Sequence, residues 1–464
     1  MLKNRLSALD ASFLSLEDED SNMCVGGADV FAGPAPEHEE VLDELGRRLD
    51  AVPNFRLRRV SVPFGLGRPR WADAEDFRLE DHITRVVLPE PGDAERVQAL
   101  FARLMAQPVD HDRPPWEIQV IEGLEGGRFA LLHKMHHALV DGIASVQVLE
   151  TLFSADPAGG DDVEPRPLEP KPAPSPVRML AESVVERTLA PEALGAVAGA
   201  VTHPRRTAGS VVKGAAGVAG LARAALRPAP DTPYNQPVGP ERSFAWQRES
   251  LDEVKAIKDA LGGSVNDVVL TAVAGALDRD LRRRGGHPGA DEMFAFVPVS
   301  LRSDSGDGQL GNEVSGLKVA LPLGEDDPLE RFARVHQTMD ALKGSPQALG
   351  ASAAVGASGL VSAAAFEAMS PVGDVQRYAN LVITNVPGPP DPLYFLGREL
   401  EDVFPFVPLA ANLAMGVAVV SYAGTLGFGF SADPETVPDV HELAPALHES
   451  LAELADAARS AASQ

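Results

Sequence analysis

The chain has 464 residues, 44% of them hydrophobic and 23% charged, which is the composition of a folded globular protein long enough for two domains. Its formal net charge of −26 argues against nucleic acid as a partner, because binding phosphates requires a basic face. Cys24 is the only cysteine, which excludes an internal disulfide and every metal motif built from several cysteines.

Helix and strand patterns alternate along residues 1–155. The first twenty residues lack an apolar run between a basic end and a cleavage site of small residues, so we expect no signal peptide. Apolar periodicity then predicts strands and amphipathic helices in turn. The predicted strands are residues 24–33 and 128–136, and the predicted helices are residues 36–52, 96–107 and 143–154.

A linker is predicted at residues 156–243, between a first domain at residues 1–155 and a second at residues 244–464. It opens with a proline-rich connector, and such segments are extended. The Ala- and Gly-rich segment that follows, Pro176–Arg227, has seven basic and three acidic residues. It therefore carries a charge of +4 in a strongly acidic chain.

The alternation resumes in the second domain. Helices are predicted at residues 250–263 and 265–284, and strands at residues 293–302 and 380–390. Residues 405–432 contain no charged residue. Their prolines, asparagines and glycines nevertheless favour a pair of buried strands over a membrane span. The sequence therefore predicts a soluble chain of two α/β halves, with that strand pair at residues 415–422 and 426–432.

Three histidines lie in the stretch HKMHHALVDG, residues 133–142. In a strand, His133 and His137 share one face, and His136 takes the other. His133 and His137 would be about 13 Å apart, too far to bind one metal ion together, so we expect no metal. The histidines are then either strand-end residues with satisfied hydrogen bonds or a proton acceptor for chemistry at an acyl group, because imidazole titrates near neutral pH.

The segment HHALVDG resembles the H-H-x-x-x-D-G signature of the coenzyme A-dependent acyltransferase superfamily. Further segments resemble the bacterial wax ester synthase/diacylglycerol acyltransferase family, and the similarity covers nearly the whole chain except the linker. The chain departs from that family at Cys24, where histidine is common, and at Pro115, where leucine precedes Trp116. The segments that carry the resemblance are LSALDASFLSLEDEDSNMCVGG, PVDHDRPPWEIQVIEGLEGGRFAL, GGSVNDVVL, VPVSLR, GNEVS and NLVITNVPGPPDPLYFLGREL.

The resemblance implies a fold and a reaction. The fold is α/β, with two chloramphenicol acetyltransferase-like domains of mixed sheets flanked by helices and an active-site tunnel at their interface. His137 would be the general base, and His136 would support the loop or contact substrate. Asp141 would be a structural carboxylate, ion-paired to an arginine, and Gly142 would permit a tight turn.

The resemblance also implies residues from the second half. Asn266 would donate to the developing oxyanion or, alternatively, cap a helix. Arg302 and Asn385 would contact substrate, and Trp116 would be either a substrate contact or a core residue. For the phosphates of coenzyme A, the candidate basic runs are Arg56–Arg59 and Leu281–Arg284, and either could equally be a solvated face.

Acyl-CoA would be a co-substrate, and no cofactor is expected. The acceptor would be diacylglycerol or a long-chain alcohol, and the protein would be cytoplasmic, at the inner membrane or on lipid droplets as a peripheral protein. The basic segment Pro176–Arg227 would dock on such a surface or be a flexible linker. Two other functions stay open: an amide-forming condensation domain, and a non-catalytic lipid-binding protein.

Overall fold

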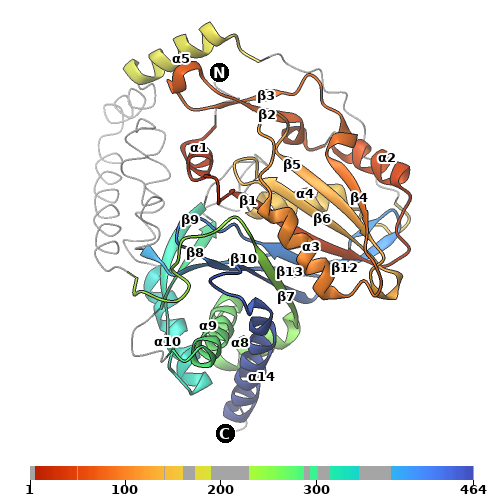
Figure 1. Cartoon of the computed structure of the whole chain (residues 1–464). Helices are drawn as coiled ribbons and strands as arrows, with labels where there is room; N and C mark the ends of the chain where they lie inside the picture. Colours follow the sequence, from red (N-terminus) through yellow and green to blue (C-terminus); the bar gives the residue numbers. More distant parts are fainter. Residues whose placement is uncertain are drawn as a thin grey trace, which may run out of the picture.

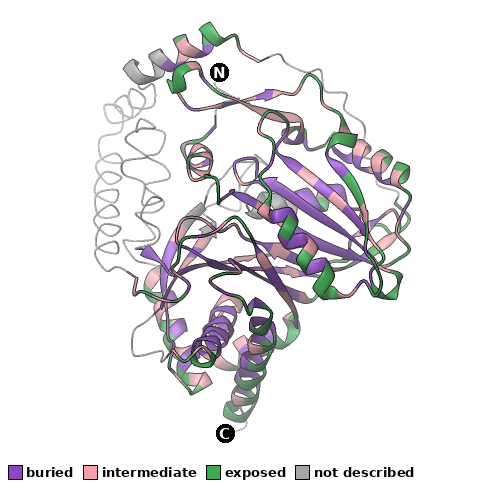
Figure 2. Cartoon of the chain, in the orientation of Figure 1, coloured by how far each residue is buried: buried purple, intermediate pink, exposed green. Residues whose placement is uncertain are grey.

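The computed structural model of the protein describes residues 6–49, 51–140, 142–159, 173–189, 229–286, 293–300, 314–343 and 378–462. These residues form two halves, each built on a six-stranded sheet (Figure 1). The strands are mainly buried, while the helices around them turn one side to solvent (Figure 2).

The sheet of the first half has the strand order β11-β12-β1-β6-β5-β4. The β4–β5 pair is parallel and the other pairs are antiparallel, so the sheet is mixed, as predicted. Apolar side chains of α2 and α4 cover one face, and those of α3 cover the other. The elements are β1 (Cys24–Phe31), β4 (Ile83–Val87), β5 (Trp116–Glu122), β6 (Phe129–His136), β11 (Tyr394–Phe395), β12 (Arg398–Phe406), α2 (His38–Leu49), α3 (Ala94–Ala106) and α4 (Gly142–Leu152).

Two strands of this sheet come from the far end of the chain. Ser154 and Tyr394 exchange backbone hydrogen bonds of 2.8 and 2.7 Å, which ties β11 to the end of the first half. Next to β11, β12 also packs closely on β14 (Thr425–Ala432) of the other sheet. A Cβ atom on Gly427 would lie 1.9 Å from the carbonyl oxygen of Val403, so the alternating glycines of LGFGFSA let the two strands approach. The predicted domain boundaries do not include this crossover.

The sheet of the second half has the order β7-β14-β13-β10-β8-β9, with β13, β10 and β8 parallel to one another. Its strands β13 and β14 form an antiparallel hairpin, which confirms the predicted strand pair. Four helices pack against one face of this sheet (Figure 1). The elements are β7 (Ser243–Ser250), β8 (Met293–Ser300), β9 (Val314–Leu321), β10 (Leu381–Val386), β13 (Met415–Tyr422), β14 (Thr425–Ala432), α8 (Leu251–Leu261), α9 (Val265–Arg283), α10 (Pro328–Lys343) and α14 (Leu443–Ala462).

The described parts of the predicted linker are anchored to the two halves. In α5, Glu182 forms a 2.7 Å ion pair with Arg70 of β3. Near the other end of the linker, the buried Tyr234 hydroxyl donates a 2.8 Å hydrogen bond to Asp280. The remaining elements are α1 (Ala8–Ser15), β2 (Leu57–Val60), β3 (Arg70–Asp73), α5 (Pro176–Leu189), and the 3-10 helices η1 (Pro53–Arg56), η2 (Pro63–Gly65), η3 (Leu79–Asp81), η4 (Glu125–Gly127) and η6 (Val440–Glu442).

Within the described residues, no single helix is long and apolar enough to cross a membrane. The pair α8 and α9 passes that test only when both are taken together, and a bend of 102° separates them. Nearly the whole length of α9 is buried against the second sheet and its neighbouring helices, as expected for a core helix.

Candidate active site

The two adjacent histidines lie where β6 ends, beside the start of β1, since His136 pairs with Cys24. One backbone hydrogen bond from each histidine fixes the main chain of the pair. The N–H of His136 donates to the carbonyl of Pro115 at 2.9 Å, and the N–H of His137 donates to the carbonyl of Met23 at 2.8 Å. The strand ends one residue earlier than the face analysis of the sequence assumed, so His137 is the first residue of the following turn.

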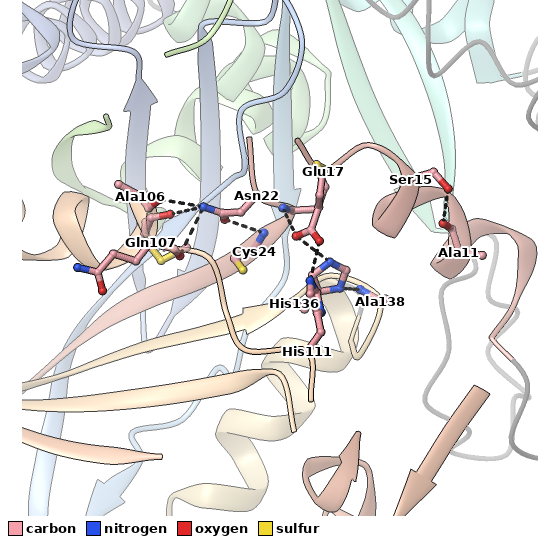
Figure 3. A network of polar contacts seen from close by, with 12 residues as sticks. Ala11, Ser15, Glu17, Asn22, Cys24, Ala106, Gln107, His111, His136 and Ala138 are labelled. Carbon is pink, nitrogen blue, oxygen red and sulfur yellow. Dashed lines mark hydrogen bonds and ion pairs between the residues drawn. The ribbon is translucent and has the colours of Figure 1, made fainter. Parts of the chain in front are cut away.

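The ring of His136 is fully buried and makes its contacts within the protein. Its Nδ1 accepts a 3.0 Å hydrogen bond from the backbone N–H of Ala138, so the ring proton belongs on Nε2. That Nε2 lies 3.1 Å from a carboxylate oxygen of Glu17 (Figure 3). Burial lowers the pKa of His136, although Glu17 opposes the shift, so the ring is neutral near pH 7.

Glu17 joins this histidine to a second one and to the loop before β1. One carboxylate oxygen lies 2.8 Å from Nε2 of His111, and the other accepts a 3.0 Å hydrogen bond from the N–H of Met23. Burial alone would raise the pKa of the Glu17 carboxyl, but the hydrogen bonds from His111 and His136 hold it below its ordinary value. Because the carbonyl of Met23 accepts the N–H of His137, Glu17 is linked to the backbone of His137.

The same three side chains raise the question of a metal site. The ligand atoms of Glu17, His111 and His136 lie within 4.8 Å of one another, and two histidines with one glutamate are a known zinc ligand set. A metal at Nε2 of His136 would require that atom to be unprotonated, whereas the bond from Ala138 places the proton there. The contacts therefore favour a hydrogen-bonded network. His133 belongs elsewhere, since its Nδ1 lies 3.0 Å from the buried Asp29.

The ring of His137 is half-buried and lies flat on Phe13 of α1. The ring centroids are 4.1 Å apart and the planes differ by 16°. A hydrogen-bonded cap at Ser7 and Asp10 fixes the start of α1. Within the described residues, a small cavity beside His133 and a groove of about 340 Å³ between α3 and the second half are present. Neither of these two is lined by His137, and the tunnel that the resemblance implies stays a prediction.

The structure brings together two predicted residues of the second half. Asn385 of β10 donates from Nδ2 to Oδ1 of Asn266 in α9, at 3.4 Å. The alternative role predicted for Asn266, a helix cap, is wrong: the cap is Ser264, whose hydroxyl accepts the N–H of Asp267. Helix α4, which follows the histidine motif, contacts β10, the strand that carries Asn385.

Trp116 has the contacts of a core residue. Its side chain is buried, its indole N–H donates to the carbonyl of Phe55 at 2.7 Å, and its ring stacks on His82 at 4.5 Å. These contacts favour packing over direct substrate contact. Among the other predicted residues, Gly142 is the first residue of α4, while Asp141 and Arg302 lie outside the described residues.

The two positions that depart from the family pattern, Pro115 and Cys24, do not remove the contacts that hold the histidine pair. Pro115 keeps the carbonyl that accepts the N–H of His136, which any residue type provides. Cys24 is fully buried, and burial raises the pKa of its thiol to about 12. The only thiol of the chain is therefore not available as a thiolate nucleophile near neutral pH.

The two predicted basic runs differ in their partners. Arg282, Arg283 and Arg284 each pair with aspartates of their own helix, so that run is neutralised. By contrast, Arg58 and Arg59 of β2 have no carboxylate partner in the part of the chain that the structure describes. The charge of Arg59 makes a small contribution to the lowered pKa of His136, after burial and the nearer groups.

Two family models match the chain. The model described as wax ester synthase/diacylglycerol acyltransferase catalytic domain matches residues 6–269, and the WS/DGAT C-terminal domain matches residues 310–455. The Mycobacterium tuberculosis strain H37Rv protein named "Probable diacyglycerol O-acyltransferase tgs1" is 33% identical, over 97% of this chain and 96% of its own. The protein of the same strain named "Probable diacyglycerol O-acyltransferase tgs2" is 35% identical, over 97% and 98%.

Solved structures with the same architecture confirm the predicted fold class. The wax ester synthase/diacylglycerol acyltransferase from Marinobacter aquaeolei VT8 has a TM-score of 0.69 at 27% identity, covering 98% of this chain and all of that one. The starter condensation domain of rhizomide synthetase RzmA has a TM-score of 0.61 at 14% identity, covering 98% and 94%. The second likeness is one of fold alone.

Proposed function

The chain belongs to the wax ester synthase/diacylglycerol acyltransferase family, and from this premise we propose that it transfers a long-chain acyl group from acyl-CoA to a hydroxyl group. The acceptor is a diacylglycerol or a long-chain alcohol, and the product is a triacylglycerol or a wax ester. Acyl-CoA is a co-substrate that is consumed, and the reaction needs no further cofactor.

The observation that carries this proposal is the different environment of the two adjacent histidines. His136 is fully buried, and both of its ring nitrogens face protein atoms, so it acts as a support. His137 is half-buried at the end of the strand, and its backbone is fixed by Met23. A base needs a fixed position and access to substrate, and of the pair His137 has both.

In the proposed step, the acceptor hydroxyl gives its proton to His137 while its oxygen attacks the thioester carbonyl. The new C–O bond forms, the C–S bond breaks, and the proton passes from His137 to the leaving sulfur of coenzyme A. No acyl-enzyme is needed, which agrees with the buried thiol of Cys24. Of the two basic runs, the one with Arg58 and Arg59 is the favoured candidate for a phosphate of coenzyme A, because the aspartates of α9 neutralise the other. Asp141 and Gly142 keep their predicted roles in holding the loop.

The proposal extends to where the protein acts. Long-chain acceptors reside in a lipid phase, so the enzyme is proposed to be cytoplasmic and peripheral at the inner membrane or on lipid droplets. The basic segment Pro176–Arg227 supports that location by its charge of +4, because anionic lipid surfaces attract basic segments.

The proposed function is tested by following release of coenzyme A from palmitoyl-CoA. We expect release to require an added acceptor, either diacylglycerol or hexadecanol, and thin-layer chromatography to show the matching ester. A panel of both acceptors with one acyl-CoA then gives the preference. Binding of lipid without acceptor-dependent release would favour a non-catalytic lipid-binding protein, and an amide product with an amine acceptor would favour condensation chemistry.

Replacement of Asn266 by alanine is expected to lower kcat by about 100-fold with little change in KM, because loss of an oxyanion donor costs about 3 kcal/mol of barrier. The hydrogen bond from Asn385 occupies Oδ1 of Asn266 and leaves its Nδ2 hydrogens for the oxyanion. The control is Asn385→Ala, which frees the amide to rotate and should lower kcat less. An unchanged kcat in Asn266→Ala would contradict this role.

A further inference from the structure

A small lobe projects from the first half beside α1 (Figures 1 and 2). It consists of the antiparallel β2–β3 hairpin, residues 57–73, and α5, and we call it the hairpin lobe. The two parts pack directly on each other. Arg70 pairs with Glu182, and a Cβ atom on Gly67 would meet the hydroxyl of Ser183 at 2.4 Å.

The hairpin lobe carries most of the exposed large apolar side chains. Four such side chains occur among the described residues, and three lie on this lobe: Phe64 at 87% exposure, Leu66 at 36% and Val177 at 76%. The fourth, Val87, lies on the edge strand β4. Phe64 has a φ of 61°, a left-handed conformation that favours glycine or asparagine, so the turn holds an aromatic ring in water where a polar residue would fit more easily.

The same lobe is basic in an acidic chain. Residues 57–73 contain four arginines and one aspartate, whereas the whole chain carries −26. Arg58 has no carboxylate partner within the described residues. Arg178 and Arg70 both pair with Glu182. Exposed apolar residues among arginines suit a surface that is apolar within and anionic outside.

The hairpin lobe is connected to the candidate active site through α1. The N–H of Leu6, just before α1, donates to the carbonyl of Pro69 in the hairpin. Farther along the same helix, Phe13 lies flat on His137. From Ala8, the first residue of α1, to Phe13 the helix rises about 8 Å. A surface bound by the lobe would therefore lie at one end of the helix that covers the histidine.

We propose that the hairpin lobe docks on an anionic lipid surface, with Phe64, Leu66 and Val177 entering the boundary between headgroups and acyl chains and the arginines contacting lipid phosphates. This inference rests on the proposed function for the identity of the acceptor, which the lipid surface holds. The exposed apolar side chains and the charge carry the docking itself.

Vesicle flotation tests the docking without any acyl-CoA present. The variant is Phe64→Asn with Leu66→Gln, because asparagine tolerates the left-handed backbone and should leave the Tm unchanged. The matched control is Val87→Thr, which removes an exposed apolar side chain elsewhere. On vesicles of phosphatidylcholine and phosphatidylglycerol, we expect the variant to partition at least about tenfold less than wild type, and the control to match wild type. Added salt and pure phosphatidylcholine vesicles should weaken wild-type binding.

Several results would overturn the docking proposal. The first is equal partitioning of variant and wild type, and the second is an equal loss in Val87→Thr. A third is wild-type self-association in light scattering that the variant abolishes while vesicle binding persists, which would assign the lobe to a contact between copies of the chain. Failure of the proposed function would give a different result from failure of docking. In that case no added acceptor would cause release of coenzyme A. If the function holds, the variant should lose transfer to diacylglycerol in vesicles and keep transfer to a short-chain alcohol in solution.

Discussion

Replacing His137 by alanine is expected to lower kcat for acyl transfer by about 1000-fold, the usual contribution of a general base. The proton of the acceptor hydroxyl then has no acceptor at the moment of attack. The ring is half-buried and stacks on Phe13, so a Tm measured in parallel separates a loss of catalysis from a loss of folding. Steady-state assays of coenzyme A release with palmitoyl-CoA and diacylglycerol give kcat and KM separately. The KM of the variant should stay near that of wild type.

A matched control for this prediction lies on the same strand. His133→Gln removes another imidazole of β6, one that is bonded to the buried Asp29, whereas His137 stacks on Phe13. This control should lose stability, because Asp29 loses its partner, yet keep kcat per folded molecule. Equal, slow release of coenzyme A by wild type and His137→Ala would contradict an enzymatic role for this residue.

Local patterns in the sequence were sufficient for the elements with strong periodicity. The helix predicted at residues 265–284 is α9, Val265–Arg283, and the strand predicted at 128–136 is β6, Phe129–His136. The crossover of β12 was not predictable in the same way, because its place beside β1 depends on pairing between residues more than 370 positions apart, such as Gly27 and Pro405. The glycines of β14 that make room for it look like ordinary strand interruptions in the sequence.

In the candidate active site, too, local motifs could be predicted from the sequence, whereas contacts between distant residues could not. The stretch around His137 has a compact motif, so its chemistry was accessible from the sequence. Glu17 and His111 were missed, because the residues they contact lie far away in the sequence: Glu17 and His111 are themselves 94 positions apart. A single glutamate within LEDED has no distinguishing pattern, and only the fold shows that it faces two imidazoles rather than solvent. The role of Phe13 was hidden for the same reason.

Glu17→Gln is expected to lower the free energy of unfolding by about 2 kcal/mol and kcat by about 10- to 100-fold. The carboxylate accepts from the N–H of Met23 and faces two imidazole nitrogens, and a hydrogen bond to a charged group contributes about 1.5–3 kcal/mol. The glutamine amide would turn N–H groups toward donors. Since Met23 holds the backbone of His137, the loop should shift, and a displacement of about 1 Å can cost about 100-fold in rate.

The control for Glu17→Gln is Glu117→Gln, which removes the carboxylate beside the buried Lys134 in the neighbouring strand. Lys134 keeps its two carbonyl partners, those of Leu104 and Gln107, and Glu117 has no link to Met23. This variant should lose stability but keep kcat per folded molecule. A loss of kcat in both variants, or in neither, would show that Glu17 does not act through the position of His137.

The stability difference between wild type and Glu17→Gln should depend on pH in one direction. The pKa of Glu17 lies below its ordinary value of 4.5, so the unfolded chain binds the proton more readily and the carboxylate stabilises the native state above that pH. The difference should therefore be constant near neutrality and shrink as the pH falls below 4.5 toward the folded pKa. His136, whose pKa is lowered from 6.5 by burial, adds a loss of native stability below that value in wild type. Denaturant titrations between neutral and acidic pH measure both, and a difference that grows in acid would contradict the assignment of Glu17 as the charged partner of the two imidazoles.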